Sequence, residues 1–495
     1  MGRILAACCL LALACSAARP PPAELGPTSE PGAVPVVREE VAPGDRSKVP
    51  EPGPAPVLKV PPQRHFQLAS GLKVRLVEYR RLPIVALHLV VDAGAVHDPK
   101  DRPGLASFTA SMMTEGTKRR SATQISDDLG FIGASLSAGA GFDSASLSGS
   151  ALVAHLDELL DLFDDVLEHP SFPPGDFARV QDQRLVSLLQ QRDQPGAVAA
   201  KTFARQFWGE HPYGHWIQGT EKSVKAMKRA DLVRYHAARW RPNVSELVVV
   251  GDVSEAELRQ KLEKALAGWT GVAPASPPPH VAPVPKLRAV LVRKRGAAPQ
   301  TFVMMGMPGL ERASPDYVPG EVASQILGGG TASRLFRELR EKEGYTYGIY
   351  SRVEARKLGG TSFIVGSVKA EVTGVATQAL LRQVDGLRTT AVPDEELAVA
   401  KNSLLLSLPS EFAIAAGIAG KVAEEVVYGL PDDYWDGYAS QVAGVTAADV
   451  QRAARKYFDP ARLTTVMVGD PGTVKAQLSK LPLGAVEVRT AASAP

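Results

Sequence analysis

Hydrophobic and polar positions repeat with two different periods along the chain, which predicts both strands and helices. Residues 72–76 alternate as a half-buried strand does, and 84–91 form a second, more continuous apolar strand. Small and apolar residues alternate over 136–147, as expected for a β-hairpin. Between 156 and 167 the apolar residues recur at helical spacing, with acidic residues between them. Strands grouped apart from long helices predict an α+β fold.

One succession of helix, proline and apolar strand occurs twice in the chain. A helix ended by Pro242 leads to an apolar strand that ends at Gly251-Asp252, and at an offset of 218 the same order recurs up to Gly469-Asp470. Residues 173–188 also match 393–408, at an offset of 220. Gene duplication explains both matches, and a chance likeness of common helix–strand patterns is the alternative. We therefore predict two homologous sandwich domains, each a mainly antiparallel sheet covered by helices.

Proline-rich segments mark the expected domain boundaries. Residues 20–62 contain 13 prolines in 43 positions, a composition that cannot bury enough apolar surface to fold. A second cluster, with six prolines in twelve positions, divides the remainder into near-equal halves. The predicted organisation is a signal peptide (1–15), a Pro-rich tether (16–62), a first domain (63–273), a Pro-rich linker (274–285), a second domain (286–482) and a flexible tail (483–495).

Composition excludes several classes of protein. The 495 residues carry 56 Lys+Arg and 53 Asp+Glu, a net charge of +3, so nothing points to nucleic acid or to an anionic membrane surface. Beyond residue 14 no apolar run reaches the ~20 residues that a membrane-spanning helix needs.

The cysteines point to export. All three lie in the first 15 residues, where Arg3 and an apolar run resemble a secretory signal peptide. Leu-Ala-Leu-Ala before Cys15 resembles a lipoprotein box, although the same alanines also fit ordinary signal-peptide cleavage. We expect a lipid on Cys15 and an exported, periplasmic protein of the cell envelope. Because Ser16 does not resemble an inner-membrane retention signal, the expected anchor is the outer membrane, and only the lipid contacts it.

One motif identifies a family. Residues 104–117 read Gly-Leu-Ala-Ser-Phe-Thr-Ala-Ser-Met-Met-Thr-Glu-Gly-Thr, after a strand pair. With the two similar halves over 63–482, this frame resembles the pitrilysin/insulinase family of zinc peptidases, in particular its short, processing-peptidase-like branch. In that family the frame carries His-x-x-Glu-His, in which two histidines on one helix face bind zinc and the glutamate acts as general base.

Here the residues of that motif are replaced. The resemblance places the two ligands at Ser107 and Ser111 and the base at Ala110, and the third ligand, a glutamate, near Leu188. The stretch 184–192 contains no acid. Hydroxyls are poor zinc ligands beside imidazole, and alanine cannot accept a proton. We therefore expect no metal cofactor in this chain, and no peptidase activity from the chain alone.

The second half keeps other features of the family. Gly328, Gly329 and Gly330 precede a helix, and the resemblance gives this glycine-rich loop a role in substrate handling; a tight turn is the simpler explanation. Arg340 and Tyr347, seven residues apart, match the pair that supports the substrate carbonyl across the cleft. Both side chains can donate to a developing oxyanion. Without the family frame, a surface arginine on a helix and a core tyrosine would be the better explanation of the two residues.

Two functions follow as hypotheses. In the first, the chain is the zinc-less subunit of a heterodimer with a zinc-bearing homologue; it supplies Arg340 and Tyr347 in trans, and the substrate is a peptide. In the second, it is a non-enzymatic peptide-binding or scaffold protein of the cell envelope.

Overall fold

The computed structural model describes residues 60–276, 285–294, 296 and 298–490. The first half comprises β1 (Gln63–Gln67), β2 (Lys73–Glu78), β3 (Ile84–Val91), α1 (Leu105–Met112), α2 (Ala122–Phe131), β4 (Ser135–Ala140), β5 (Ala145–Leu152), α3 (Leu156–Glu168), α4 (Pro174–Gln190), α5 (Pro195–Trp208), α6 (Glu221–Ala226), α7 (Arg229–Arg239), β6 (Ser245–Gly251) and α8 (Glu255–Ala265).

The second half comprises β7 (Arg288–Arg293), β8 (Gln300–Pro308), α9 (Tyr317–Gly328), α10 (Arg334–Phe336), a π-helix (Arg337–Lys342), β9 (Gly348–Arg356), β10 (Gly359–Lys369), α11 (Thr373–Thr389), α12 (Asp394–Glu411), α13 (Ala415–Tyr428), α14 (Tyr434–Gly444), α15 (Ala447–Tyr457), β11 (Thr464–Gly469), α16 (Pro471–Leu478) and β12 (Val486–Thr490).

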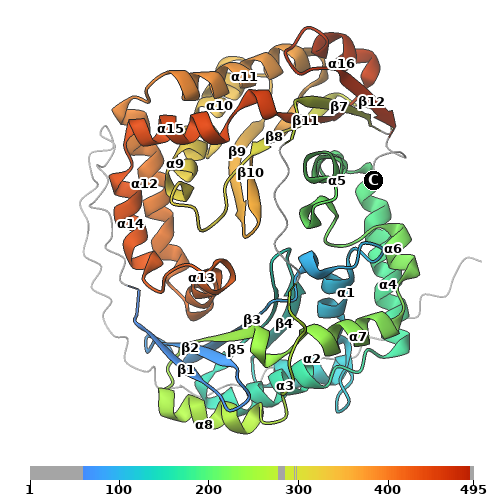
Figure 1. Cartoon of the computed structure of the whole chain (residues 1–495), viewed down its shortest axis with the longest axis vertical. Helices are drawn as coiled ribbons and strands as arrows, with labels where there is room; N and C mark the ends of the chain where they lie inside the picture. The colour runs from blue at the N-terminus through green and yellow to red at the C-terminus, as the bar shows by residue number, and fades with distance from the viewer. Residues whose placement is uncertain (1–59, 277–284, 295, 297, 491–495) are drawn as a thin grey trace, which may run out of the picture. The chain divides into compact units, whose positions relative to one another are not determined.

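Each half builds one six-stranded sheet (Figure 1), and five strands of each sheet follow the same order. The first runs β1-β2-β6-β3-β5-β4 and the second β12-β7-β11-β8-β10-β9. Most neighbouring strands are antiparallel; β2 with β6, and β7 with both β11 and β12, are parallel. The predicted α+β class with two homologous, mainly antiparallel sheets is confirmed, and the hairpin expected near 136–147 is formed by β4 and β5.

The sheets differ in the strand at one edge, and this corrects one expectation. The first sheet is completed by β1, which directly precedes β2 and pairs with it in antiparallel fashion. The second is completed by β12, which returns from the end of the described chain and lies parallel to β7. The predicted flexible tail at 483–495 therefore contains a strand over Val486–Thr490. The predicted signal peptide, Cys15 and most of the tether lie outside the described residues.

Each sheet is buried on both faces, because a helix of the opposite half covers one of them. In β6, Leu247 and Val249 pack against helices of their own half, whereas Val248 and Val250 join a cluster that includes α13. Continuous apolar strands such as this one are typical of sheets covered on both sides. Helix α13 lies against β3 and β6, and Figure 1 shows it beside β3.

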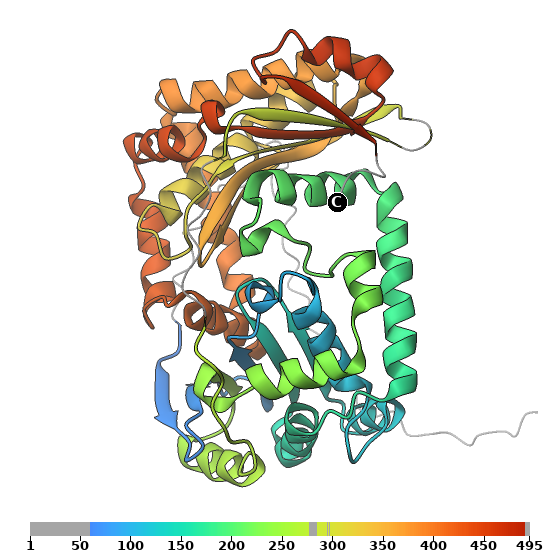
Figure 2. The same ribbon diagram turned by 45° about the vertical axis from the view of Figure 1, so that its right-hand side comes forward.

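Helix α5 makes the equivalent contact with the second sheet. Its Phe203 packs on Gly306 of β8 so closely that a Cβ added to Gly306 would overlap the ring. Other apolar side chains of α5 meet the outward-facing valines of β7 and β11, including Val290 and Val466. Figure 2 shows the second sheet between this green helix and the orange and red helices of its own half. Each half thus contributes one helix that covers the sheet of the other half: α5 covers the second sheet and α13 covers the first.

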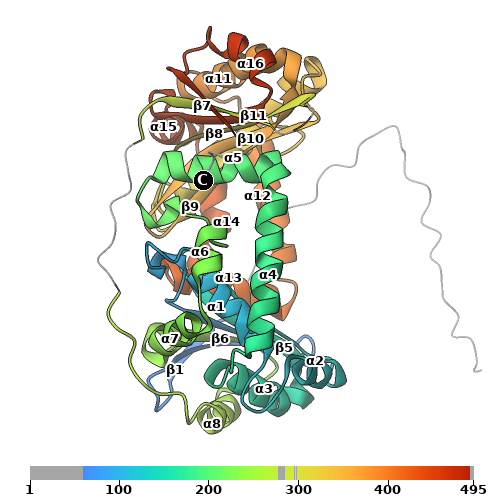
Figure 3. The same cartoon turned by 90° about the vertical axis from the view of Figure 1, so that its right-hand side faces the viewer.

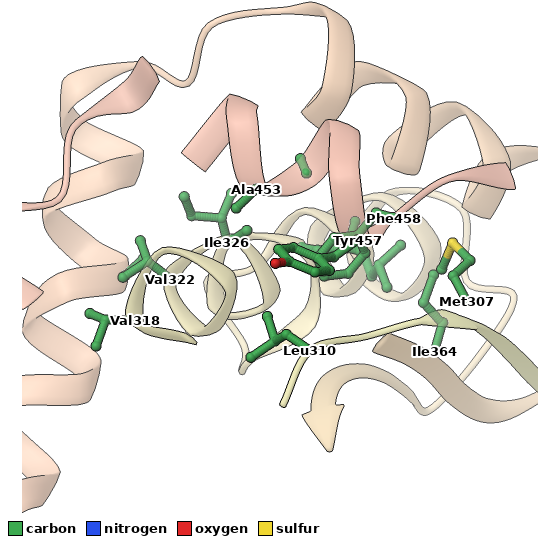
Figure 4. Close-up of a cluster of buried hydrophobic side chains, with 14 of the residues drawn as sticks. Met307, Leu310, Val318, Val322, Ile326, Ile364, Ala453, Tyr457 and Phe458 are labelled. Atoms are coloured by element: carbon green, nitrogen blue, oxygen red, sulfur yellow. The ribbon is translucent and has the colours of Figure 1, made fainter. Parts of the chain in front are cut away.

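The second half has its own large core on the opposite face of its sheet. Figure 4 shows α9, through Val318, Val322 and Ile326, facing Ala453 and Tyr457 of α15, with Met307 of β8 close by. All six side chains are buried, and each exposes less than a tenth of its surface.

Polar contacts also join the halves. The backbone N–H of Leu358, in the β9–β10 turn, donates to the Tyr213 hydroxyl (3.0 Å), which also hydrogen-bonds to Asp143 in the β4–β5 turn. Elsewhere Gln63 Nε2 donates to Glu425 Oε2 on α13 (2.7 Å). Burial raises the pKa of this carboxyl to about 7.

Among the described residues no single helix is long and apolar enough to cross a membrane. One pair of helices, α12 with α13, would meet the length and composition criteria together, but it bends by 116° at their junction. Here α13 covers the first sheet.

Candidate functional site

Helix α1 carries the degenerate motif, and its start is fixed by a carboxylate. Asp98 accepts hydrogen bonds from the backbone N–H groups of Gly104 (2.6 Å) and Ala106 (2.7 Å), two donors that the first turn leaves free. The same carboxylate lies 3.2 Å from His215 Nε2. Gly104 has a φ of 95° and lies against Gly219, so this turn accepts only glycine. The loop that contains Ile217 is thereby held against the first turn of α1.

The two serines of the motif lie on one face of α1, one turn apart. Ser107 Oγ donates to the carbonyl of Ile217 (2.7 Å), and Ser111 Oγ donates to the carbonyl of Phe108 (3.0 Å). Ala110, at the position of the general base, is fully buried. Each serine hydroxyl therefore already has an acceptor for its proton.

Both serines also accept hydrogen bonds from Arg184 on α4. Nη1 donates to Ser107 Oγ (2.8 Å), and Nη2 donates to Ser111 Oγ (2.9 Å) and to the carbonyl of Ser107 (3.3 Å). The guanidinium also lies over the Phe108 ring, 4.7 Å from its centroid. A single cationic side chain thus bridges the two positions at which the family holds its metal. Figure 3 shows α4 alongside α1.

Arg184 stays charged in this place. Burial lowers the pKa of its guanidinium to about 10, and the negative charge of Asp98 opposes that shift. The side chain is therefore protonated at neutral pH. Its direct hydrogen-bond partners are two hydroxyls and a carbonyl, all of them neutral.

These residues do not fit a zinc ion. The serine oxygens are neutral, weak ligands, and a positive charge sits between them where a divalent cation would have to bind. Ala110 offers no group to deprotonate a bound water. Across the described ranges, no three His, Cys, Asp or Glu side chains are grouped so that they could hold a metal ion.

Arg184 belongs to this site although no sequence motif indicated it. The family likeness places a third ligand near Leu188, but Leu188 is a core side chain, 3% exposed. Arg184, one helical turn earlier, is the residue that meets the motif, and it follows Ser107 by 77 positions. The available signal was that Arg184 begins the stretch without acids, at the place where the resemblance puts the third ligand.

The other candidate residues lie in the second half. Gly328 ends α9 against β9, where an added Cβ would overlap the backbone of Ser351. Around Gly330, in contrast, an added Cβ would meet nothing within 4 Å. At Gly329 an added Cβ would overlap Gln325, so close packing explains two glycines of the triplet and leaves the last one in open space.

Arg340 and Tyr347 are both exposed. Arg340 belongs to the π-helix, where its guanidinium lies over the Phe336 ring, 4.6 Å from the centroid. Tyr347 directly precedes β9 and exposes 82% of its surface. Within the described part of the chain no carboxylate pairs with Arg340, in contrast to Arg337, which is bound to Glu396 (3.0 Å). Both side chains are free to meet a ligand, whereas the serine pair of the first half is closed by Arg184.

Comparison with known proteins places these features in one family. Residues 74–221 match the family described as Insulinase (Peptidase family M16), and residues 226–404 match Peptidase M16 inactive domain. The chain is 24% identical over 396 residues to the Non-peptidase homolog YmxG of Helicobacter pylori, covering 79% of this chain and 90% of that protein. It is 22% identical over 351 residues to the Uncharacterized zinc protease YmxG of Bacillus subtilis, covering 70% and 85%.

Solved structures of known proteins share the fold of this chain. A peptidase M16 inactive domain from Pseudomonas fluorescens is similar with a TM-score of 0.77 and 29% identity, covering 83% of this chain and 98% of that one. A protease from Helicobacter pylori has the same fold, with a TM-score of 0.76 and 19% identity over 82% of this chain and 99% of that one. Because the family matches together span more than half of the sequence, the chain belongs to the insulinase family, peptidase family M16, as a catalytically incomplete member.

Proposed function

We propose that this chain is the metal-free subunit of a peptidase that it forms with a zinc-bearing homologue. The observation that carries the proposal is an asymmetry between the halves. The first half has a metal position closed by Arg184, and the second half presents Arg340 and Tyr347 to solvent. A guanidinium and a phenol can both donate to the oxyanion that forms when a peptide bond is attacked. In this arrangement the partner contributes the metal and the attacking water.

A second candidate is a peptide-binding or scaffold protein without enzymatic activity. It is favoured by the cation at the degenerate site, which suits binding more than hydrolysis. Co-purification of the chain with its native partner, followed by metal analysis and a peptide-cleavage assay, separates the two. A partner that contains zinc and cleaves peptides only in the complex supports the first function; a stable complex without zinc or cleavage supports the second.

We expect the purified chain alone to contain far less than one zinc per molecule and to leave unstructured peptides intact. The reason is that neutral oxygens and a guanidinium replace the ligands, and that alanine replaces the base. Metal analysis by mass spectrometry and a cleavage assay with and without a chelator measure both properties. Stoichiometric zinc together with chelator-sensitive hydrolysis by the pure chain would contradict the expectation.

We further propose that the protein is exported and anchored in the outer membrane of the cell envelope by a lipid on Cys15, with residues 16–62 as the tether. Several acyl chains on one cysteine suffice for stable anchoring, since each buried CH₂ contributes about 0.8 kcal/mol. Mass spectrometry of the mature N-terminus is expected to find a chain that begins at acylated Cys15. An unmodified start at Cys15 or beyond would exclude the lipid anchor.

A further inference from the structure

The positive charge of Arg184 is only partly matched by its surroundings. Three of the five N–H groups of a guanidinium are used by Ser107 and Ser111. The remaining donors have no acceptor within the described ranges. Because Nε is not one of the fully buried atoms without a partner, it is accessible to solvent. The side chain is partly exposed, so the two remaining donors lie at the edge of the site, toward solvent.

The nearest acid is not available to Arg184. Asp98 is 1% exposed, and its two oxygens are taken by the N–H groups at the start of α1 and by His215. It lowers the local potential without forming an ion pair with Arg184. A partly buried cation held by neutral groups binds an anion more tightly than a surface lysine or arginine does, because water screens it less.

Two nearby features also favour an anion at this position. Ser107 lies in the first turn of α1, where the helix macrodipole is positive. Phe108, stacked on Phe177 at 5.3 Å, gives the guanidinium an apolar floor that holds its plane in one orientation. The two free donors, Nε–H and one N–H of Nη1, lie in a fixed plane, and either can donate a charge-assisted hydrogen bond to a carboxylate oxygen.

We propose that the former metal position of this chain is a carboxylate-binding site, in which Arg184, held by Ser107 and Ser111, pairs with a peptide carboxylate. The ligand is a C-terminal carboxylate or an Asp or Glu side chain of a bound peptide. The site goes beyond the proposed function, because it needs neither a partner subunit nor a metal.

Calorimetric titration of the full chain tests the site with three N-acetylated alanine tetrapeptides. The first has a free C-terminal carboxylate, the second is its C-terminal amide, and the third is an amide with glutamate in the third position. We expect a carboxylate peptide to bind at least about tenfold more tightly than the plain amide, since a hydrogen bond to a charged group contributes about 1.5–3 kcal/mol. The first and third peptides identify which source of carboxylate the site prefers.

Variants assign the binding to the site. Arg184→Gln should reduce the affinity for the carboxylate peptide to that for the amide, and Arg184→Lys should restore only part of it, because an ammonium cannot bond both serines and a carboxylate from one planar set of donors. Arg179→Gln is the matched control: Arg179 lies on the same helix but is exposed and paired with Asp176 (3.0 Å) and Glu115. It should leave the affinity unchanged.

Three results would overturn the proposal. They are equal affinity of wild-type protein for the carboxylate and amide peptides, no binding of either, and undiminished carboxylate binding by folded Arg184→Gln. The wild-type comparison decides the question even if Arg184→Gln does not fold, and it is independent of whether a zinc-bearing partner exists.

Discussion

In a complex with a zinc-bearing homologue, Arg340→Ala and Tyr347→Phe are each expected to lower peptide turnover by about 10²–10³, the usual cost of losing one oxyanion donor. Each substitution removes a donor from an exposed side chain, so assembly should be unaffected. Turnover of a flexible peptide by reconstituted complexes measures the effect, and gel filtration confirms that the complexes form.

The control for this prediction lies on the same π-helix. Arg337 is equally basic and 55% exposed, but it is bound to Glu396, so Arg337→Ala should change turnover little. Arg340→Lys should restore little activity, because an ammonium does not reproduce the planar fork. If Arg340→Ala and Tyr347→Phe complexes assemble and cleave at the unmodified rate, the site is not shared and the scaffold function remains.

Phe203→Ala is expected to lower the free energy of unfolding by about 3–5 kcal/mol, the range for removing a buried aromatic side chain. Phe203 of α5 lies directly on Gly306 of β8, and glycine has no side chain that could fill the space left by the ring. Because α5 belongs to the first half and β8 to the second, the loss should reduce the stability of both halves. Equilibrium unfolding in urea, followed by circular dichroism and by tryptophan fluorescence, measures it.

Val375→Ala serves as the comparison. Val375 is 49% exposed on α11, and its truncation should cost less than about 0.5 kcal/mol. A cost for Phe203→Ala as small as that for Val375→Ala would show that α5 does not hold the second sheet.

Much of the fold follows from periodicity in the sequence. The apolar run Ile84–Val91 is β3, and the helix expected over 156–167 is α3. The repeat also predicted that α7 and α15 occupy equivalent places, each followed by a strand that ends in glycine. These features are local, or they repeat at a fixed offset, and such features can be found without three-dimensional contacts.

Long-range contacts could not be predicted in this way. The apolar positions of α5 show that the helix is buried but not which sheet buries it. Likewise, the missing acids near Leu188 predict the loss of a ligand, but only the packing of α4 on the first half reveals that Arg184 fills its place. The strand β12 was missed because its exposed residues, such as Glu487, do not give the pattern of a buried strand.

The exchange of α5 and α13 has a consequence for assembly. Each sheet has an apolar face that its own half does not cover, so an isolated half would expose that face to water and tend to associate. Two copies of one half, related by a two-fold axis, could satisfy each other in the same way. Because both halves belong to one chain, this pairing is intramolecular, and the fraction of halves that are paired does not depend on protein concentration. The covalent connection thus does for this chain what dimerisation would do for its separate halves.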